Sequence, residues 1–266
     1  MESTKIATST WHWGSDTKEQ IEQSFSDIAK AGYKSFEAVY TSIRTFSYDV
    51  PAYKKLLDQY GVHPISFYFY LPDLTERNGF FQNLEKELEF VQALGVRNVC
   101  LAGTQGRPKS SGDLECELQM VQTFTDLCTA HQITAAIHPH YQTYFTYEDE
   151  WSEILERVPE ARFCPDTAHL ILAGCDPERI FCKYADKICF VHFKDMVFHK
   201  GEKFPDGAEA YGAFRDLGEG NINFKRLYQI LCENCYTGII CSEFDNPPKS
   251  DFESAKINLE YLKKLI

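Results

Sequence analysis

The run Lys187–Asp195 starts with β-branched and aromatic residues and ends in His192, Lys194 and Asp195. Side chains alternate between the two faces of a strand, so Phe190, His192 and Lys194 point to the same side. A strand buried on both sides has no structural need for an imidazole and an ammonium group at its end, whereas a site at that end does. The pattern therefore indicates a functional site where this strand finishes.

Polar side chains stand at the ends of several other β-rich runs in the same way. Aspartate, histidine and glutamate side chains that converge on one rim form a mixed nitrogen and oxygen metal site. The sequence therefore predicts a metal site at the carboxyl ends of the strands. The residues at these ends are Glu37, His138, His140, Asp166, His169, His192, Lys194, Glu243 and Asp245.

Each of these residues also has an ordinary structural interpretation. A strand-end Asp or Glu is often a helix N-cap, and a single His on an apolar strand is often a core residue with satisfied hydrogen bonds. Lys194 can pair with Asp195 or Asp166 at the surface. Four successive strand ends with metal-ligating residues are harder to explain in this way, and their coincidence favours the metal site.

The elements that must position these residues are eight short β-rich runs, each joined to the next by a helical pattern or a loop. The chain has 266 residues, close to the ~250 that are typical of a (β/α)8 TIM barrel. A doubly wound sheet is the competing fold, but the first run lacks the GxGxxG fingerprint of a dinucleotide site. The first expected helix follows Asp16, which we predict to be its N-cap. The expected strands are 5–11, 35–40, 64–70, 96–102, 133–140, 161–166, 187–195 and 238–244.

No composition shift or low-complexity segment divides residues 1–266, so we expect a single barrel domain. One long irregular piece, residues 196–221, follows the seventh expected strand and contains Pro205 and Arg215. A loop of this length on a barrel is typical of an active-site lid.

Composition limits the class of partner. The formal net charge is −12, and no basic run is present, which argues against binding to nucleic acid. No signal peptide and no apolar run long enough to cross a bilayer is evident, so a cytoplasmic protein is expected. The ten cysteines suit free thiols in a reducing compartment. One pair, Cys232 and Cys235, has CxxC spacing, but without a second pair we interpret it as incidental.

Five motifs together resemble the xylose-isomerase-like sugar isomerase/epimerase superfamily. They are Ile137–Thr143 (IHPHYQT), Cys164–Leu170 (CPDTAHL), Val191–Asp195 (VHFKD), Leu217–Gly220 (LGEG) and Ser242–Asp245 (SEFD). The resemblance implies a TIM barrel that binds a divalent metal, most often Mn²⁺, with Mg²⁺, Co²⁺ and Zn²⁺ as alternatives. Carried over by motif, the implied ligands are His138, Asp166, His192 and Glu243.

The strand-5 ligand departs from the family pattern, in which this position is commonly Glu. His138 takes that place here, with His140 as the alternative ligand. A symmetric epimerase with two metal-bound glutamates is therefore in doubt, and the His-x-His and His-x-Lys-Asp motifs look more like inosose dehydratase and its relatives, which are lyases.

The resemblance also implies roles for individual side chains. A metal chelating the carbonyl and a neighbouring hydroxyl stabilises the enolate formed when a base removes the α-proton. Loss of a β-hydroxyl then gives elimination, and return of the proton gives isomerisation or epimerisation. The expected catalytic residues are Glu243, His140, Lys194 and His169, and the expected substrate-binding residues are Arg215, His169, Trp11, Phe67 and Glu37, with Trp13, Phe69 and Tyr144 as further aromatics near the rim.

Four functions stay open at this point. They are a lyase acting on a keto-polyol or a 3-keto-glycoside, a sugar or sugar-phosphate isomerase or epimerase, a phosphodiesterase of the endonuclease IV type, and a non-catalytic sugar-binding subunit. The charge of −12 argues against the phosphodiesterase. A carbohydrate or cyclitol is the expected partner, and a homo-oligomer is an open expectation.

Overall fold

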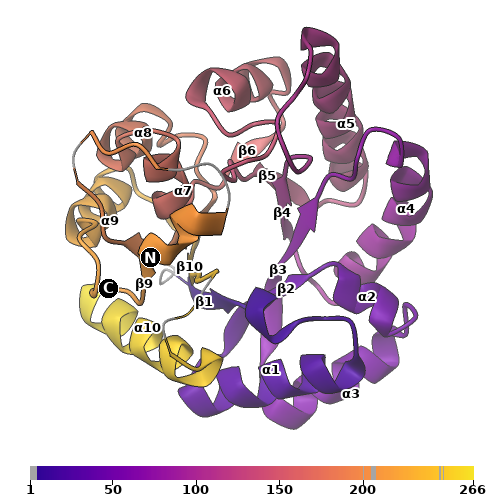
Figure 1. The fold of residues 1–266 in the computed structure, drawn as a ribbon. Coiled ribbons are helices and arrows are strands. Elements are labelled where there is room, and N and C mark those ends of the chain that lie inside the picture. The colour runs from indigo at the N-terminus through magenta and orange to yellow at the C-terminus, as the bar shows by residue number, and fades with distance from the viewer. Residues whose placement is uncertain (1–4, 200, 205–207, 246, 248) are drawn as a thin grey trace.

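Parallel strands form a ring at the centre of the molecule (Figure 1). The structure is a computed structural model that describes residues 5–199, 201–204, 208–245, 247 and 249–266. The strands of the ring are β1 (Lys5–Ser9), β2 (Ser35–Val39), β3 (His63–Tyr70), β4 (Asn98–Ala102), β5 (Thr134–Ile137), β6 (Arg162–Phe163), β7 (Phe190–Phe193) and β10 (Ile239–Ser242).

The strand order confirms the predicted TIM barrel. Hydrogen-bonded neighbours run β6-β5-β4-β3-β2-β1-β10-β7, and all of these pairs are parallel. Two isolated parallel bridges, Phe163 with Ile188 and Asp166 with His192, join β6 to β7 and complete the ring. β6 is shorter than the expected strand 161–166 because Pro165, which lacks an N–H, interrupts it.

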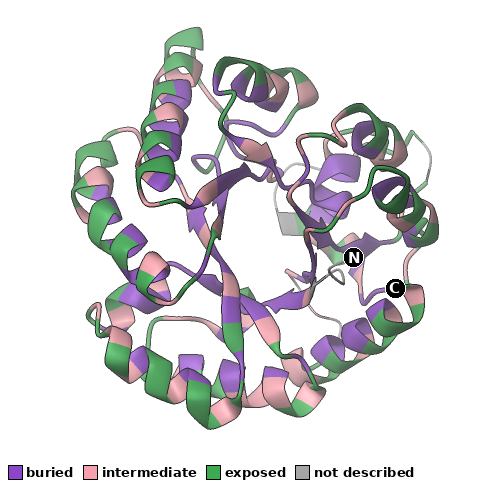
Figure 2. Cartoon of the chain, turned by 180° about the vertical axis from the view of Figure 1, so that it is seen from behind, coloured by how far each residue is buried: buried purple, intermediate pink, exposed green. Residues whose placement is uncertain are grey.

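Helices surround the ring, and their buried faces are turned toward the strands (Figures 1 and 2). α1 begins after Thr17, which forms a capping box with Gln20, so the prediction that Asp16 is the N-cap is wrong by one residue. The helices are η1 (Trp11–Trp13), α1 (Lys18–Ala31), α2 (Thr41–Thr45), α3 (Val50–Tyr60), α4 (Arg77–Ala93), α5 (Ser111–Ala130), α6 (Glu148–Arg157), α7 (Thr167–Leu172), α8 (Pro177–Lys183), η2 (Ala208–Ala213), α9 (Phe224–Glu233) and α10 (Asp251–Leu265). Among the described residues, no helix is long and apolar enough to cross a membrane.

The two faces of each strand enter different parts of the core. On β7, Val191 and Phe193 pack in the large cluster between strands and helices, whereas Phe190 belongs to a small cluster inside the ring. His192 and Lys194 alternate with the outward residues and are buried. The prediction that Phe190, His192 and Lys194 share one face of this strand is therefore confirmed, and this face points into the barrel.

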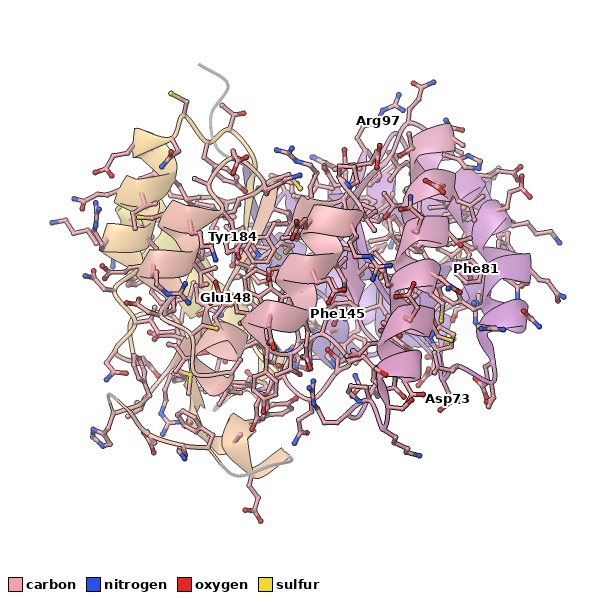
Figure 3. All side chains as sticks on the ribbon, turned by 90° about the horizontal axis from the view of Figure 1, so that it is seen from above. Asp73, Phe81, Arg97, Phe145, Glu148 and Tyr184 are labelled. Carbon is pink, nitrogen blue, oxygen red and sulfur yellow. The ribbon has the colours of Figure 1, made fainter. Side chains whose placement is uncertain are left out.

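The two ends of the barrel differ in what they expose. Figure 3 looks at the barrel from the side, with Arg97, which precedes β4, at one end and Asp73, which follows β3, at the other. All strands of the ring run in the same direction, so every predicted site residue that follows one of them lies at the Asp73 end. This is the end at which TIM-barrel enzymes have their active sites.

A buried carboxyl group holds the turn after β4 at this end. Glu117 of α5 accepts hydrogen bonds from the backbone N–H and the hydroxyl of Thr104, each at 2.7 Å. Burial raises the pKa of Glu117 to about 7, from an ordinary value of 4.5. The folded protein therefore holds this proton more tightly than the unfolded chain does.

We expect this group to make stability fall as pH rises. Its contribution is fully present below about pH 4.5 and is lost as pH rises through about 7, for a total of about 3 kcal/mol. Glu117→Gln keeps an acceptor for the Thr104 N–H and cannot ionise. Denaturant unfolding between pH 4.5 and 8 should therefore show a steeper loss of stability in the wild type than in the variant, and parallel pH profiles would contradict this.

Candidate metal centre and active site

Four side chains at neighbouring strand ends converge inside the barrel. One nitrogen or oxygen atom from each of His138, Asp166, His192 and Glu243 lies within 4.8 Å of the other three. All four residues are buried. His138 therefore joins this group, whereas His140, the alternative strand-5 residue, belongs to a different cluster nearer the rim.

Both ring nitrogens of His138 lack a hydrogen-bond partner among the described residues. The converging atoms of Asp166, His192 and Glu243 contact only other ionisable side chains of the site. Buried polar atoms normally have partners, so unpartnered imidazole nitrogens that face the same point as two carboxylates call for a ligand. Two imidazoles and two carboxylates suit a divalent cation such as Mn²⁺, Mg²⁺, Co²⁺ or Zn²⁺. The donor set thus fits the metal that the motifs imply.

Asp166 serves the fold with one oxygen and faces the cluster with the other. Its Oδ1 accepts hydrogen bonds of 2.9 Å from the backbone N–H groups of Ala168 and His169 and so caps α7. Its Oδ2 lies 3.3 Å from Nζ of Lys194. Burial raises the pKa of Asp166 to about 6, against the opposing effect of Lys194. The N-cap interpretation and the ligand interpretation of this residue are therefore compatible.

His192 lies between two glutamates. Its Nδ1 contacts Oε2 of Glu243, and its Nε2 lies 3.0 Å from Oε2 of Glu37. The other oxygen of Glu37 accepts a hydrogen bond of 2.9 Å from the hydroxyl of Ser66. Burial acts to lower the pKa of His192, but Glu243 and Glu37 outweigh it and hold that pKa well above its usual range.

Lys194 connects the four-residue group to the rim. Its Nζ lies 3.2 Å from Oε1 of Glu243, 2.6 Å from Oδ2 of Asp245 and 3.0 Å from Nε2 of His169. Burial acts to lower the pKa of Lys194, but Asp166, Asp245 and Glu243 outweigh it and keep the pKa well above its usual range. The ammonium group therefore stays charged and holds these carboxylates together.

The rim cluster consists of His140, His169 and Asp245. One ligand-type atom of each lies within 4.8 Å of the others. The two imidazole rings are 3.8 Å apart between centroids, and Nε2 of His169 is 3.4 Å from Oδ2 of Asp245. Burial lowers the pKa of His140, and burial together with His140 lowers the pKa of His169 well below its usual range. Both rings are therefore uncharged at neutral pH.

A cavity of about 450 Å³ opens beside these clusters. Glu243 from the four-residue group and His140 and Asp245 from the rim cluster face it. Its walls combine aromatic rings with a few polar groups, as is usual for small-molecule sites. The lining residues are Ser9, Thr10, Trp11, Glu37, Val39, Tyr68, Tyr70, Gln105, His140, Tyr211, Glu243 and Asp245.

The aromatic predictions have mixed outcomes. Trp11 lines the cavity, is 44% exposed and packs edge-on against Tyr68 and Tyr70. Phe67 does not line it, because its side chain points outward and packs between Tyr53 and Phe90. Both faces of β3 are aromatic, so alternation could not tell which one is inward. The tyrosine hydroxyls were the available signal, since Tyr favours a site with a polar side and Phe favours the core. Trp13, Phe69 and Tyr144 also lie outside this cavity.

The loop after β7 reaches the site through a residue other than the expected one. Arg215 donates hydrogen bonds to the carbonyl groups of Gly212 and Phe214 in its own loop and does not line the cavity. Tyr211 of η2 lines it instead. The loop also contains a short antiparallel pair, β8 (Asp195–Met196) with β9 (Phe214–Arg215). Pro205, which the sequence places in this loop, lies outside the described residues.

Asp195 anchors both ends of this loop. Its carboxylate accepts hydrogen bonds from the backbone N–H groups of Met196, Gly218, Gly220 and Ile222. A Cβ atom at Gly220 would lie 2.2 Å from Oδ1 of Asp195, so this close approach requires glycine. The loop is therefore fixed next to Lys194, the neighbouring residue on the opposite face.

We expect Asp195→Asn to loosen this loop, because the new amide group would face backbone N–H groups with a donor. The expected loss is about 2–3 kcal/mol of unfolding free energy, with faster protease cleavage within residues 196–221. Asp113→Asn is the control, since Asp113 also accepts backbone N–H groups but is partly exposed in a capping box. Equal effects of the two substitutions on stability and cleavage would contradict the anchoring role.

Comparison with known proteins decides the family. A family model described as xylose isomerase-like TIM barrel matches residues 25–265. The chain belongs to this family. The resemblance inferred from the five motifs is therefore confirmed, and with it the prediction of a carbohydrate-modifying enzyme.

Individual relatives agree with this assignment. The inosose dehydratase of Clostridium beijerinckii is 26% identical over 272 residues, which cover 92% of this chain and 89% of that protein. A xylose isomerase-like TIM barrel protein from Mycobacterium smegmatis, solved in complex with magnesium, has a TM-score of 0.80 at 15% identity and covers 100% of this chain and 98% of that one. The 3-keto-D-glucoside 4-epimerase YcjR from E. coli has a TM-score of 0.77 at 14% identity, with 98% and 100% covered.

Proposed function

We propose that this protein is a metal-dependent lyase that removes the proton next to the carbonyl group of a keto-polyol or keto-sugar and then expels a β-hydroxyl as water. The observation that carries the proposal is the position of His138 within the converging group, where a second glutamate would support a symmetric epimerase. The match to inosose dehydratase over most of both chains supports the same reaction class.

In this proposal His138, Asp166, His192 and Glu243 hold the cation, with Mn²⁺ as the favoured ion. A divalent cation bound there acts as a Lewis acid toward the substrate carbonyl and lowers the barrier to proton removal by several kcal/mol. The convergence of one donor atom from each of these four buried residues, and the unpartnered ring nitrogens of His138 among the described residues, support the ligand assignment.

His140 is the proposed proton carrier. It lines the cavity, and its lowered pKa leaves the ring uncharged and able to take the α-proton. The electrons of the broken C–H bond form the carbon–carbon double bond as the β C–O bond breaks. Protonated His140 then gives its proton to the departing hydroxyl, so the net change is loss of one water.

Neither Lys194 nor His169 lines the cavity. Their proposed role is to hold His140 and the neighbouring carboxylates in position. The ring of His169 packs against that of His140, and Lys194 holds the position of Asp245 and Glu243. Trp11 and Tyr211 are the proposed contacts to the apolar face of the substrate ring. Arg215 keeps no substrate-binding role in this proposal, because its guanidinium group is bonded within the loop.

A sugar isomerase or epimerase is the second candidate, and Glu37 favours it. This carboxylate lines the same cavity as Glu243 and belongs to a different strand, so two carboxylates face the substrate space. Such a pair can remove a proton on one side and return one on the other. The structural likeness to a 3-keto-D-glucoside epimerase agrees with this alternative.

The two reactions differ in product mass. Purified protein loaded with Mn²⁺, Mg²⁺, Co²⁺ or Zn²⁺ is incubated with keto-inositols, ketoses and 3-keto-glucosides. The lyase predicts an ultraviolet-absorbing unsaturated product that has lost one water. A product of unchanged mass would overturn the lyase and support the isomerase, and an absence of turnover and metal binding across the panel would contradict both.

We expect His138→Glu to shift the balance between these reactions. The new carboxylate adds a third anionic ligand beside Asp166 and Glu243, so elimination should fall by about 10-fold to 100-fold, while any epimerase activity should rise. His63→Glu is the control, because His63 is exposed and starts β3 at the opposite end of the barrel. Unchanged elimination in His138→Glu would contradict the importance of the strand-5 ligand.

A further inference from the structure

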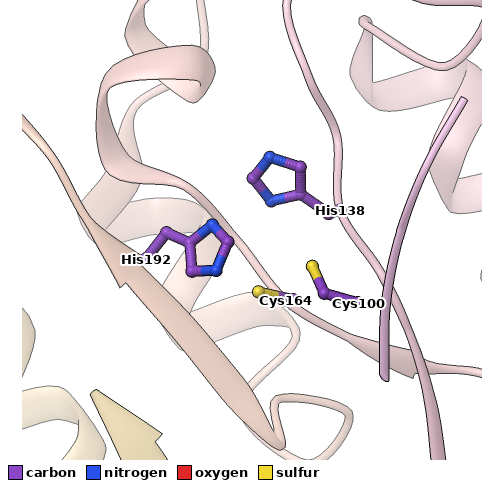
Figure 4. Close-up of side chains that lie close together, drawn as sticks. All are labelled: Cys100, His138, Cys164 and His192. Carbon is purple, nitrogen blue, oxygen red and sulfur yellow. The ribbon is translucent and has the colours of Figure 1, made fainter. Parts of the chain in front are cut away.

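Two thiols lie below the proposed metal centre, inside the ring of strands. Cys100 belongs to β4 and Cys164 follows β6, and both are fully buried in the small inner cluster of the barrel. One ligand-type atom from each of Cys100, Cys164, His138 and His192 lies within 4.8 Å of the other three. Figure 4 shows the two sulfur atoms and the two imidazole rings turned toward one space between the strands.

Ordinary core packing explains part of this arrangement, since a buried cysteine behaves as a small apolar side chain. It does not explain why two thiols share their space with two imidazoles, one of which, His138, has no hydrogen-bond partner for either ring nitrogen among the described residues. An N₂S₂ donor set of this kind is typical of tetrahedral sites for Zn²⁺ and related thiophilic cations.

The distances allow a tetrahedral ion. At normal zinc–nitrogen and zinc–sulfur bond lengths, neighbouring donor atoms lie about 3.3 to 3.8 Å apart. Donor atoms that already lie within 4.8 Å of one another need to approach by at most about 1.5 Å.

We propose that Cys100, Cys164, His138 and His192 form a second metal position that selects thiophilic cations, below the carboxylate-containing position used by harder cations. On binding, each thiol loses its proton to solvent and forms a sulfur–metal bond. Asp166 and Glu243 supply oxygen at the upper position, whereas the lower position supplies sulfur, and both use the same two histidines.

The shared histidines have a functional consequence, which rests on the proposed function. None of the four lower-position residues lines the substrate cavity. A thiophilic ion held there occupies His138 and His192 away from the substrate, so it inhibits the enzyme. Harder cations at the upper position thus support activity, whereas thiophilic cations at the lower position inhibit it.

The test uses Co²⁺, whose bonds to thiolate give an intense ultraviolet charge-transfer band. Cys232 and Cys235 are exposed free thiols, so the reduced full-length protein carries Cys232→Ala and Cys235→Ala throughout. We expect a saturable thiolate–Co²⁺ band that is lost in Cys100→Ala and in Cys164→Ala. It should persist in Cys128→Ala, since Cys128 is a buried cysteine on α5 outside the set. Co²⁺ binding without the band, or a band that survives in Cys100→Ala and Cys164→Ala, would overturn the proposal.

A second measurement tests the inhibition and keeps the two proposals distinguishable. Preincubation with Cd²⁺ should reduce Mn²⁺-supported turnover at least 10-fold in the Cys232→Ala, Cys235→Ala protein. The additional Cys100→Ala and Cys164→Ala substitutions should reduce this inhibition, and equal inhibition with and without them would overturn the inhibitory role. The charge-transfer result needs no substrate, so it stands or falls independently of whether the protein is a lyase.

Discussion

An Asp166→Asn variant is expected to lose about 10³-fold in kcat/KM and to bind divalent cations much more weakly while keeping its fold. Oδ1 of Asp166 caps α7 through the N–H groups of Ala168 and His169, and asparagine is an equally good N-cap. The atom Oδ2, which faces the other proposed ligands and Lys194, becomes an amide nitrogen, which cannot ligate a cation. Loss of an anionic ligand that stabilises developing charge by about 4 kcal/mol corresponds to about a thousandfold loss in rate.

The matched control for this substitution is Asp176→Asn. Asp176 caps α8 by accepting a 3.0 Å hydrogen bond from the Glu178 N–H, and its side chain is exposed and outside the cavity. Metal titration by calorimetry, with circular dichroism and thermal unfolding, separates ligand loss from misfolding. Asp176→Asn should bind metal as the wild type does. Retained metal affinity in Asp166→Asn would remove this residue from the proposed ligand set.

Replacing Lys194 by methionine is expected to have the second-largest effect. Lys194 is fully buried, and its ammonium group lies within 3.3 Å of carboxylate oxygens of Asp166, Glu243 and Asp245. Methionine keeps the length of the side chain but leaves these buried carboxylates without their cation. Breaking a buried ion pair in this way costs about 3–5 kcal/mol of stability. Turnover should fall by about 10²-fold to 10³-fold, because the rim cluster that contacts the cavity loses its support.

This destabilisation should depend on the metal. A divalent cation bound beside Asp166 and Glu243 compensates part of the same negative charge, so saturating Mn²⁺ should restore part of the lost stability. Lys183→Met is the control, since Lys183 forms an exposed 3.0 Å ion pair with Glu148 that is worth less than about 1 kcal/mol. Denaturant unfolding with and without Mn²⁺ measures the difference. An equal loss for Lys194→Met in both conditions would contradict the idea that ammonium and metal share these carboxylates.

The barrel and much of its polar centre could be predicted from the sequence because strand-end residues obey a simple rule. Parallel strands finish at the same edge, so Asp166, His192 and Glu243 had to approach one another once eight βα units were recognised. Alternation placed Phe190, His192 and Lys194 on one face, and the structure confirms this. Asp166 illustrates why competing interpretations need not exclude each other, since one carboxylate has two oxygens with separate partners.

The remaining errors arise where the alternation of side chains does not reveal which face points into the barrel. On β3, aromatic residues occupy both faces, so the sequence predicts Phe67 at the pocket, although Tyr68 and Tyr70 line it. Arg215 lies in a loop with no periodicity, and its orientation follows from local bonds to Gly212 and Phe214. The proximity of Cys100 and Cys164 depends on the stagger of the strands, which the sequence does not state. These features follow from the three-dimensional arrangement of the strands and the loop.

The anchoring of the loop by Asp195 has a consequence for how this protein can diversify. One carboxylate binds the N–H of Met196 at the start of the loop and those of Gly218, Gly220 and Ile222 at its end. Phe214, Asp216 and Leu217 are buried between these clamps, so the exposed positions of the loop can change in sequence while the backbone of Lys194 stays in place. Because the loop supplies Tyr211 to the cavity wall, it works as an exchangeable module. New substrate preferences can arise there without rebuilding the metal-ligand end of the barrel.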